Sequence, residues 1–409
     1  MLLTNSHQKF RNPHLDFPTQ KASYGRYGIH DYPAMLHYLV VREILKEFSS
    51  DKKTLYDPFC GSGVSLCEGL RFGLKVFGTD INPLALLITK VRTSKPVKIP
   101  INTILNKIKT SKTDIPQVKN LEYWFKDYVI EDLGKIRSAI KDFQGESFYE
   151  LLLVTFSQTI RDVSNNRKGE FKRFRLSEEE LTKFNPNVLE VFTKKLLDFC
   201  YRLRSDSIPT TSSSVNLYRS DTRQKIPFEE KIDVVITSPP YGDSRTTVAY
   251  GQFSSFSLDW LKGLNPYGDA DLTLDKDSLG GKLTKDKLSL SKSLSSTLDK
   301  LYQIDKKRAE EVNAFYSDLF LACKNIANQL NNNAILCFVV GNRCVKGIQI
   351  PMDDIVKEIF ELLGLKHLKT FIREIRNKRM PILNSPSNIV GKKSNTMKYE
   401  YVVLLEKTS

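Results

Sequence analysis

The sequence predicts an α/β fold built around a mostly parallel β-sheet. Two short apolar runs, residues 54–56 and 232–236, are typical of buried strands, and a loop of unusual composition follows each one. The first loop is Asp57-Pro58-Phe59-Cys60-Gly61-Ser62-Gly63, and the second is Thr237-Ser238-Pro239-Pro240-Tyr241-Gly242. Because parallel strands end at the same edge of a sheet, we expect the loops to lie side by side, where open α/β sheets bind ligands.

The first loop, residues 57–63, is called the glycine loop here, and its pattern suits a nucleoside-containing ligand. Gly61 and Gly63 allow the backbone to pass close to a ligand. A helix is predicted over residues 64–71 and a strand over 76–79, and Asp80 ends that strand. An acid at this position suits the two hydroxyls of a ribose. Neither G-x-G-x-x-G nor a Lys-Ser/Thr pair is present, so a phosphate-binding loop is not indicated.

The second loop, residues 237–242, is called the Ser-Pro-Pro-Tyr loop, and its residues suit chemistry on an exocyclic amine. The lone pair of such an amine is delocalised into its ring, so a catalyst must draw the N–H groups toward acceptors. Ser238 Oγ and the carbonyl of Pro239 are the candidate acceptors, and the prolines hold the backbone rigid. Tyr241 can stack on an unstacked base, a contact worth roughly 1–3 kcal/mol. The alternative is an ordinary Pro-Pro turn with Tyr241 on the surface.

Together the two loops resemble those of S-adenosylmethionine-dependent DNA amino-methyltransferases. The continuation Gly242-Asp243-Ser244-Arg245-Thr246-Thr247 is similar to the N4-cytosine enzymes of restriction–modification systems, and the resemblance covers residues 22–92 and 214–260. It implies a Rossmann-like fold with a seven-stranded, mostly parallel sheet, helices on both faces and a helical insertion. It also implies S-adenosylmethionine as cofactor, double-stranded DNA as substrate and a possible cognate restriction endonuclease. Serine before Pro-Pro favours cytosine N4, and adenine N6 stays open.

The resemblance also implies which residues form the site. The catalytic residues would be Ser238, Pro239, Pro240 and Tyr241. The cofactor-binding residues would be Tyr27, His30, Pro33, Asp57, Phe59, Cys60, Gly61, Gly63, Asp80, Ile81, Asp221 and Thr237. Tyr27, His30 and Pro33 could equally mark an aromatic helix entry, and Asp221 could cap a turn. Cys60 is expected to pack, because amine methylation needs no thiol nucleophile.

The chain is long enough for one large domain with insertions. We assign residues 1–92 and 214–409 to the catalytic domain, 93–213 to a helical insertion and 262–305 to a second insertion. Either insertion could recognise DNA, and the basic, aromatic-containing run in 93–213 favours the first. Residues 1–21 should be loop-like. The other predicted helices are 33–48, 83–92, 121–143, 148–163, one capped by residues 177–180, 306–329 and 353–363; the other strands are 212–218, 334–340 and the closing pair 369–375 and 399–406.

Charge favours a polyanionic partner, since 409 residues carry a formal net charge of +15. A run over residues 161–175 mixes Arg and Lys with Asn and aromatics, which could read base edges or contact only phosphates. A second basic connection spans 376–398. The candidate DNA-binding residues are Arg161, Arg167, Lys168, Lys172, Arg173, Arg175, Arg245, Arg376, Lys378 and Arg379.

The remaining composition narrows the class of protein. Six cysteines and five histidines lack metal-ligand spacing, which predicts reduced thiols, a cytoplasmic setting and no metal. No apolar run approaches the ~20 residues of a membrane span, and nothing in the sequence indicates an oligomeric state. Besides DNA amino-methylation, two hypotheses stay open: an RNA amine methyltransferase acting on guanine N2 or adenine N6, and a catalytically inactive DNA-binding subunit.

Overall fold

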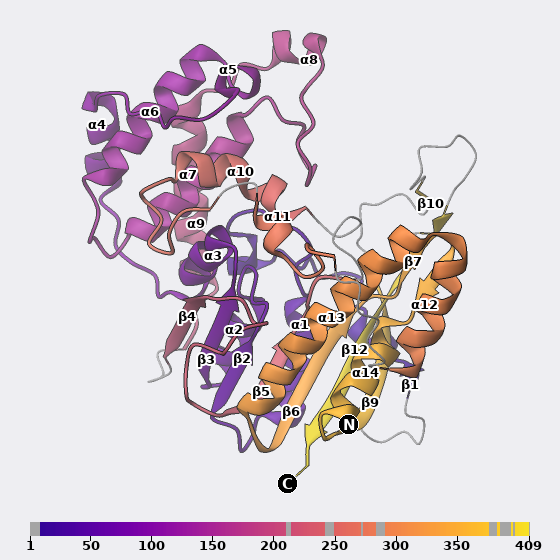
Figure 1. Ribbon diagram of the computed structural model, residues 1–409. Helices are drawn as coiled ribbons and strands as arrows, with labels where there is room; N and C mark the ends of the chain where they lie inside the picture. The colour runs from indigo at the N-terminus through magenta and orange to yellow at the C-terminus, as the bar shows by residue number, and fades with distance from the viewer. Residues whose placement is uncertain are drawn as a thin grey trace.

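The computed structural model describes residues 9–209, 214–241, 249–270, 273–283, 291–375, 383–384, 394–395 and 397–408. Its centre is an eight-stranded sheet with the order β1-β9-β12-β6-β5-β2-β3-β4 (Figure 1). The strands are β1 Lys9–Arg11, β2 Thr54–Asp57, β3 Lys75–Asp80, β4 Val215–Arg219, β5 Ile232–Thr237, β6 Leu330–Val340, β9 Leu365–Glu374 and β12 Tyr399–Lys407; the small pairs are β7 Arg343–Val345 with β8 Ile348–Ile350 and β10 Leu383–Asn384 with β11 Ser394–Asn395.

The sheet is mostly parallel, as predicted. Strands β4, β3, β2, β5 and β6 run parallel, and β12 alone is antiparallel to its neighbours β6 and β9. The expectation of seven strands with a loop-like start was wrong by one strand, because β1 pairs with β9 through Lys9 and Thr370. Phe10 packs edge-on against Phe371 with ring centroids 5.2 Å apart. Three residues are too few to show the alternation that identifies a strand in sequence.

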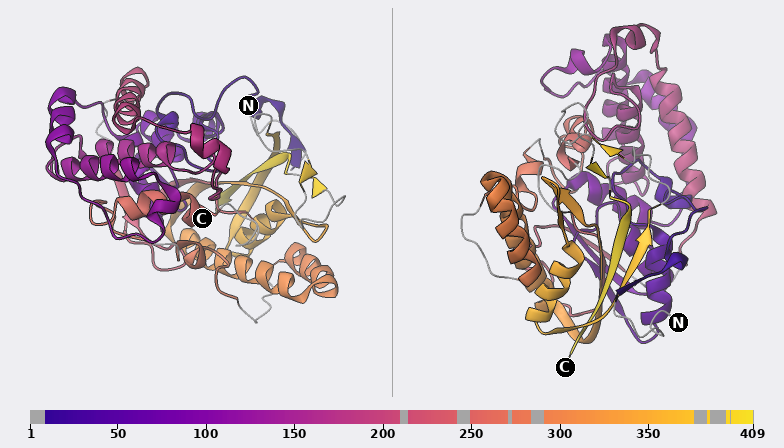
Figure 2. Two further views of the ribbon diagram at one scale, coloured as in Figure 1. Left: turned by 90° about the horizontal axis from the view of Figure 1, so that it is seen from above. Right: turned by 90° about the vertical axis from the view of Figure 1, so that its right-hand side faces the viewer.

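Alternating side chains of the sheet bury both of its faces. On β6, Leu336, Phe338 and Val340 join one hydrophobic cluster with helices α12 Lys292–Ile304, α13 Lys306–Gln329 and α14 Met352–Leu362. Cys337 and Val339 point the other way, toward α1 Tyr38–Phe48 and α2 Val64–Arg71. The right-hand view of Figure 2 shows the orange helices on one face of the sheet and the indigo helices on the other. The predicted arrangement of helices on both faces is confirmed.

A helical unit stands beyond the carboxyl edge of the sheet, at the upper left of Figure 1. Its core contains Phe156, Phe199, Phe256 and Trp260, together with the outer face of α3, which spans Pro83–Thr93. The unit comprises α4 Ile101–Thr110, α5 Leu121–Trp124, α6 Asp127–Lys141, α7 Tyr149–Val163, α8 Glu178–Lys183, α9 Val188–Ser205 and α10 Tyr250–Trp260. Helix α10 follows the Ser-Pro-Pro-Tyr loop in the chain, so the helical unit includes a segment from outside residues 93–213. The short α11, Leu274–Asp277, lies next to α10.

Two predicted helices differ in their bounds. The helix expected from residue 33 begins at Tyr38, because Ala34 has a left-handed φ of 53° and His37 caps the helix by accepting the Leu39 N–H at 3.3 Å. The helix expected over residues 121–143 is divided into α5 and α6, because Phe125 between them is extended with φ −141°. By contrast, the predicted bounds of α2 and α13 agree with the structure.

Candidate active site

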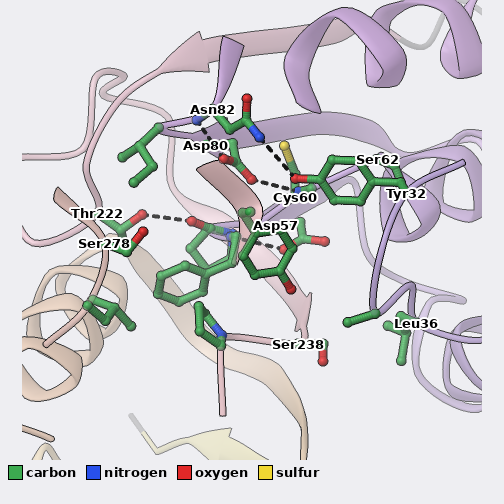
Figure 3. Close-up of a pocket in the computed structure, with 18 of the residues that line it drawn as sticks. Tyr32, Leu36, Asp57, Cys60, Ser62, Asp80, Asn82, Thr222, Ser238 and Ser278 are labelled. Atoms are coloured by element: carbon green, nitrogen blue, oxygen red, sulfur yellow. Dashed lines mark hydrogen bonds between the residues drawn. The ribbon is translucent and has the colours of Figure 1, made fainter. Parts of the chain in front are cut away.

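A cavity of about 940 Å³, including its open side, lies at the carboxyl edge of the sheet, and both loops line it. Residues 57–62 of the glycine loop form one wall, and Ser238 and Pro240 form part of another. Figure 3 shows Tyr32, Cys60 and the Asp80 carboxylate gathered on one side, with Ser238 across from them. The predicted meeting of the two loops is therefore found in the structure. Further lining segments are residues 32–36, 80–82, 220–223 and 277–279, with Tyr250 and Leu274.

The glycine loop is held against Asp80 by backbone hydrogen bonds. Gly61 N donates to Asp80 Oδ2 at 2.9 Å, and Asn82 N donates to Asp80 Oδ1 at 2.8 Å. Gly63 has a φ of 80°, and a Cβ there would lie 2.6 Å from the Thr89 side chain, so only glycine fits. Burial raises the pKa of Asp80 to about 6, although the backbone hydrogen bonds oppose the shift. Asp80 is thus an ordered, mostly ionised acceptor at neutral pH.

Asp57 is the second carboxylate of the cavity and is only 4% exposed. Its Oδ1 accepts the Thr237 hydroxyl at 2.6 Å and the Phe59 N–H at 3.1 Å. Burial raises the pKa of Asp57 to about 6. Thr237, a predicted cofactor residue, is fully buried and lies outside the cavity lining. It therefore links the ends of β5 and β2 and orients Asp57.

The Ser-Pro-Pro-Tyr loop presents a serine hydroxyl that is already oriented. Ser238 Oγ lies 2.8 Å from the Tyr241 hydroxyl. Pro239 is buried and Tyr241 lies outside the cavity lining, close to Gly341. Burial raises the pKa of Tyr241 well above its ordinary value, so its hydroxyl stays protonated at neutral pH. The cavity can therefore hold one ligand against the carboxylates of Asp57 and Asp80. The oriented hydroxyl of Ser238 is then available to a second molecule that lies beside that ligand.

Comparison with known proteins decides the family. Over 97% of its length the chain is 36% identical to the Type II methyltransferase M.MvaI of Kocuria varians, and the match covers 94% of that protein. The chain belongs to the Type II DNA methyltransferases. A shorter match, 33% identical over 69 residues, links 17% of this chain to 13% of the Type II methyltransferase M.MjaII of Methanocaldococcus jannaschii. No family model matches the chain.

Solved structures resemble this methyltransferase only loosely. The rRNA methyltransferase aviRa from Streptomyces viridochromogenes shares 12% identity at a TM-score of 0.32, with 92% of this chain and 88% of that chain covered. A superposition this loose says nothing about the substrate.

Most of the predicted cofactor residues line the cavity of the methyltransferase, and Tyr27, His30, Gly63 and Thr237 do not. Pro33, Phe59, Cys60, Ile81 and Asp221 line it together with the residues described above. Asp221 also pairs with Arg223 at 2.6 Å.

Tyr27 and His30 lie behind the cavity wall. The Tyr27 hydroxyl donates to Glu68 of α2, and the ring stacks on Tyr38 with centroids 4.9 Å apart. His30 Nε2 lies 2.7 Å from Ser157 Oγ on α7, and burial lowers its pKa to about 3, so the imidazole is neutral. Both side chains attach the first cavity wall to helices rather than face the cavity.

Sequence reasoning missed several wall residues and the arginine that joins them. Tyr32, Met35 and Leu36 line the cavity beside the predicted Pro33, and Asn82 lines it beside the predicted Asp80 and Ile81.

Arg92, at the end of α3, connects the wall to the glycine loop. Its guanidinium donates to the Ile29 carbonyl at 2.8 and 3.0 Å, to the His30 carbonyl at 2.9 Å and to Ser62 Oγ at 2.7 Å. Arg92 is fully buried, and burial lowers its pKa to about 10. A lone arginine at a predicted helix end carries no sequence signal for this role.

The candidate DNA-binding residues that the structure describes fall into three groups. Arg161 is committed to the fold, since it stacks on the Phe253 ring at 3.6 Å and donates to the Phe253 carbonyl at 2.6 Å. Arg173 and Arg175 lie over aromatic rings of the helical unit, and Arg175 also pairs with Glu178. Arg167, Lys168 and Lys172 are exposed. Arg245, Arg376, Lys378 and Arg379 lie outside the described residues.

All six cysteines are free thiols, and five of them are buried. Within the described residues, no three His, Cys, Asp or Glu side chains gather in a way that could hold a metal ion. In the same part of the chain, no helix combines the length and apolarity needed to cross a membrane.

Proposed function

We propose that this methyltransferase transfers a methyl group from S-adenosylmethionine to the exocyclic N4 amine of a cytosine flipped out of double-stranded DNA, as the modification enzyme of a restriction–modification system. The observation that carries the proposal is one cavity lined by the glycine loop, Asp57 and Asp80 together with Ser238 and Pro240. Serine before Pro-Pro supports cytosine N4 as the target.

The cavity fits the proposed cofactor. Asp80 can accept the ribose hydroxyls, because a carboxylate has about four acceptor sites and the backbone N–H groups of residues 61, 81 and 82 do not use all of them. Asp57 supplies a negative charge near the positively charged end of the cofactor. Leu36, Phe59 and Ile81 add apolar wall for a flat ring. Residues 32–36 and 57–62 would therefore hold the cofactor between them.

The Ser-Pro-Pro-Tyr loop would prepare the amine. If Ser238 donates its proton to the Tyr241 oxygen, both Ser238 lone pairs stay free to accept an amine N–H. The Pro239 carbonyl is the second proposed acceptor, and these two bonds favour a tetrahedral nitrogen with an available lone pair. S-adenosylmethionine supplies an electrophilic methyl group on a sulfonium sulfur. The nitrogen–methyl bond would form as the methyl–sulfur bond breaks, which leaves a neutral thioether, and the nitrogen would then release one proton to water. Most of the rate gain would come from alignment.

We also propose that the helical unit, mainly residues 93–213, recognises the DNA, and that residues 262–305 form a second insertion in the catalytic domain. The exposed Arg167, Lys168 and Lys172 support the first assignment. Phosphate contacts of this kind make affinity fall steeply with salt concentration.

Labelled S-adenosylmethionine tests the function directly. The protein is incubated with plasmid DNA or RNA, and the nucleosides are identified by mass spectrometry after digestion. N4-methylcytosine in DNA supports the proposal. N6-methyladenine would move the target to adenine, methyl in RNA alone would contradict the DNA assignment, and cofactor binding without transfer would favour an inactive subunit.

Variants of the loop test the residue roles. Ser238→Ala should lower turnover by about 100-fold or more, as loss of a transition-state hydrogen bond does, with cofactor affinity unchanged by calorimetry. Ser278→Ala is a matched control, because Ser278 lines the same cavity and its hydroxyl donates to the Leu274 carbonyl. Tyr241→Phe keeps the ring and removes the hydroxyl, while Tyr241→Ala removes both, so the pair separates orientation of Ser238 from base stacking.

A further inference from the structure

Residues 165–176 form a short hairpin between α7 and α8, called the basic hairpin here. Asn165 accepts the Leu176 N–H at 2.8 Å, and Arg167 N donates to the Phe174 carbonyl at 2.8 Å. The Asn166 side chain accepts the Phe174 N–H at 2.7 Å. The hairpin is also anchored at its base, because Asn165 N donates to the Trp124 carbonyl at 2.8 Å. These bonds preorganise a projection from the helical unit, and Figure 1 shows it beside α10.

The basic hairpin exposes two aromatic rings among cationic side chains. Phe171 is 45% exposed and Phe174 is 48% exposed. Arg167, Lys168 and Lys172 of the same hairpin are exposed as well. Aromatic rings interleaved with Lys and Arg are typical of surfaces where bases stack and phosphates are neutralised together. The chemistry of this surface therefore fits a nucleic acid whose bases are partly unstacked.

The position of Phe171 relates the hairpin to the cavity. Its ring lies edge-on to Phe253 of α10, with centroids 6.4 Å apart. Phe253 in turn contacts Tyr32 with centroids 5.8 Å apart, and Tyr32 lines the cavity. Arg161 fixes Phe253 by stacking on it at 3.6 Å. Phe171 is thus two ring contacts from Tyr32 in the wall of the cavity.

A base that enters the cavity leaves a gap in the duplex. Opening that gap costs a few kcal/mol of lost stacking and pairing, and each new base–aromatic stack returns roughly 1–3 kcal/mol. Apolar side chains are known to enter between base steps of a deformed duplex. A ring held beside the cavity wall can therefore keep the gap from closing while the target base is outside the helix.

We propose that Phe171 is a positioning residue that stacks in the gap left by the target base, while Arg167, Lys168 and Lys172 hold the flanking phosphates. This inference rests on the proposed function, because it requires a duplex with one base removed from the stack. Phe171 acts on the DNA and not on the transferred methyl group. Its contribution should therefore depend on whether the duplex must be opened.

Two duplexes that differ only at the target test this role. In one the target cytosine, mapped from methylated DNA, is paired with guanine; in the other it faces an abasic site and is already free to leave. Phe171→Ala should lower kcat/KM on the paired duplex by about 5- to 150-fold, the equivalent of one lost stack, and by less than about 3-fold on the abasic duplex. Leu362→Ala is the control for loss of an exposed apolar side chain, because Leu362 lies on α14, is 62% exposed and is not part of the cavity lining; it should change neither rate.

Two outcomes would overturn the inference. Full activity of Phe171→Ala on the paired duplex removes the stacking role, and an equal loss on both duplexes makes Phe171 a general docking or folding residue. Anisotropy measurements of affinity for the same duplexes give the comparison without turnover. If the wild-type protein binds both duplexes but methylates neither, the proposed function fails. This inference is then decided by affinity, because Phe171→Ala should weaken binding of the paired duplex more than binding of the abasic duplex.

Discussion

Replacing Asp57 with asparagine should stabilise the protein and weaken its hold on the cofactor. The pKa of Asp57 is raised from an ordinary value near 3.9 to about 6 by burial. Two units correspond to about 3 kcal/mol between the protonation states. Asparagine can keep the Thr237 and Phe59 hydrogen bonds, because both are made to Oδ1 alone. The third partner, the Ser65 hydroxyl, can either donate or accept a hydrogen bond, so it can also bond to the new amide group. The substitution therefore removes a buried charge while its hydrogen-bond partners stay in place.

The size of the effect on stability depends on pH. Because the folded protein binds the Asp57 proton more tightly than the unfolded chain does, stability is lost as pH rises from about 4 to about 6. Asparagine at position 57 does not titrate. The unfolding free energy of Asp57→Asn should therefore rise above that of the wild type as pH increases from about 4 to about 6, and the difference should stay at up to about 3 kcal/mol at higher pH. Urea unfolding at pH 4, 6 and 8 measures the difference. The same variant should bind S-adenosylmethionine about 10- to 100-fold more weakly, as loss of a charged contact predicts.

Asp233→Asn provides a control of opposite sign. Burial alone would raise the pKa of Asp233, but hydrogen bonds from Lys53 N at 2.9 Å and Thr54 N at 3.1 Å outweigh it and the pKa is lowered. Asp233 lies at the other edge of the sheet from the cavity, so its substitution should destabilise the protein at pH 8 and leave cofactor affinity unchanged. If Asp57→Asn were also destabilising at pH 8, or bound the cofactor normally, the reasoning about a buried cavity charge would be refuted.

Three other substitutions have defined outcomes. Gly63→Ala should lower the unfolding free energy by roughly 2–4 kcal/mol in urea, because it adds left-handed strain and an overlap with Thr89; a normal midpoint would contradict this. Asp80→Ala should raise the calorimetric Kd for S-adenosylmethionine by about 10-fold or more, since it removes an ordered acceptor and leaves two loop N–H groups unpaired. Arg92→Met should destabilise the protein by about 3 kcal/mol or more, because buried oxygens of residues 29, 30 and 62 lose their donor; thermal unfolding at the wild-type temperature would argue otherwise.

The elements that sequence reasoning located well are those in which local signals agree. The path from β2 through the glycine loop and α2 to β3 combines an apolar strand, glycines at a turn and an amphipathic helix, so its bounds and the place of Asp80 follow from short-range rules. Helix α13 combines an Asp305 cap with a long apolar stripe. Local chemistry was sufficient in both cases.

The features that were missed depend on contacts between distant segments. Tyr27 and His30 belong to the segment that forms the first cavity wall, yet their side chains turn toward α2 and α7 because Glu68 and Ser157 offer buried partners there. Arg161 lies in a run whose composition is typical of a DNA contact, but its guanidinium contacts Phe253, 92 residues further along the chain. Helix α10 likewise packs with the helical unit through Phe256 and Trp260. No window of sequence contains both halves of any of these pairs.

The hydrogen bonds of Arg92 affect how the cavity binds its ligand. Arg92 donates hydrogen bonds both to the Ile29 carbonyl and to Ser62 of the glycine loop. The two cavity walls therefore keep their spacing when no ligand lies between them. Little conformational entropy then remains to be lost on association, which favours tight capture by a rigid receptor. Exchange of a used cofactor for a fresh one should accordingly proceed through the open side of the cavity, without separation of these walls.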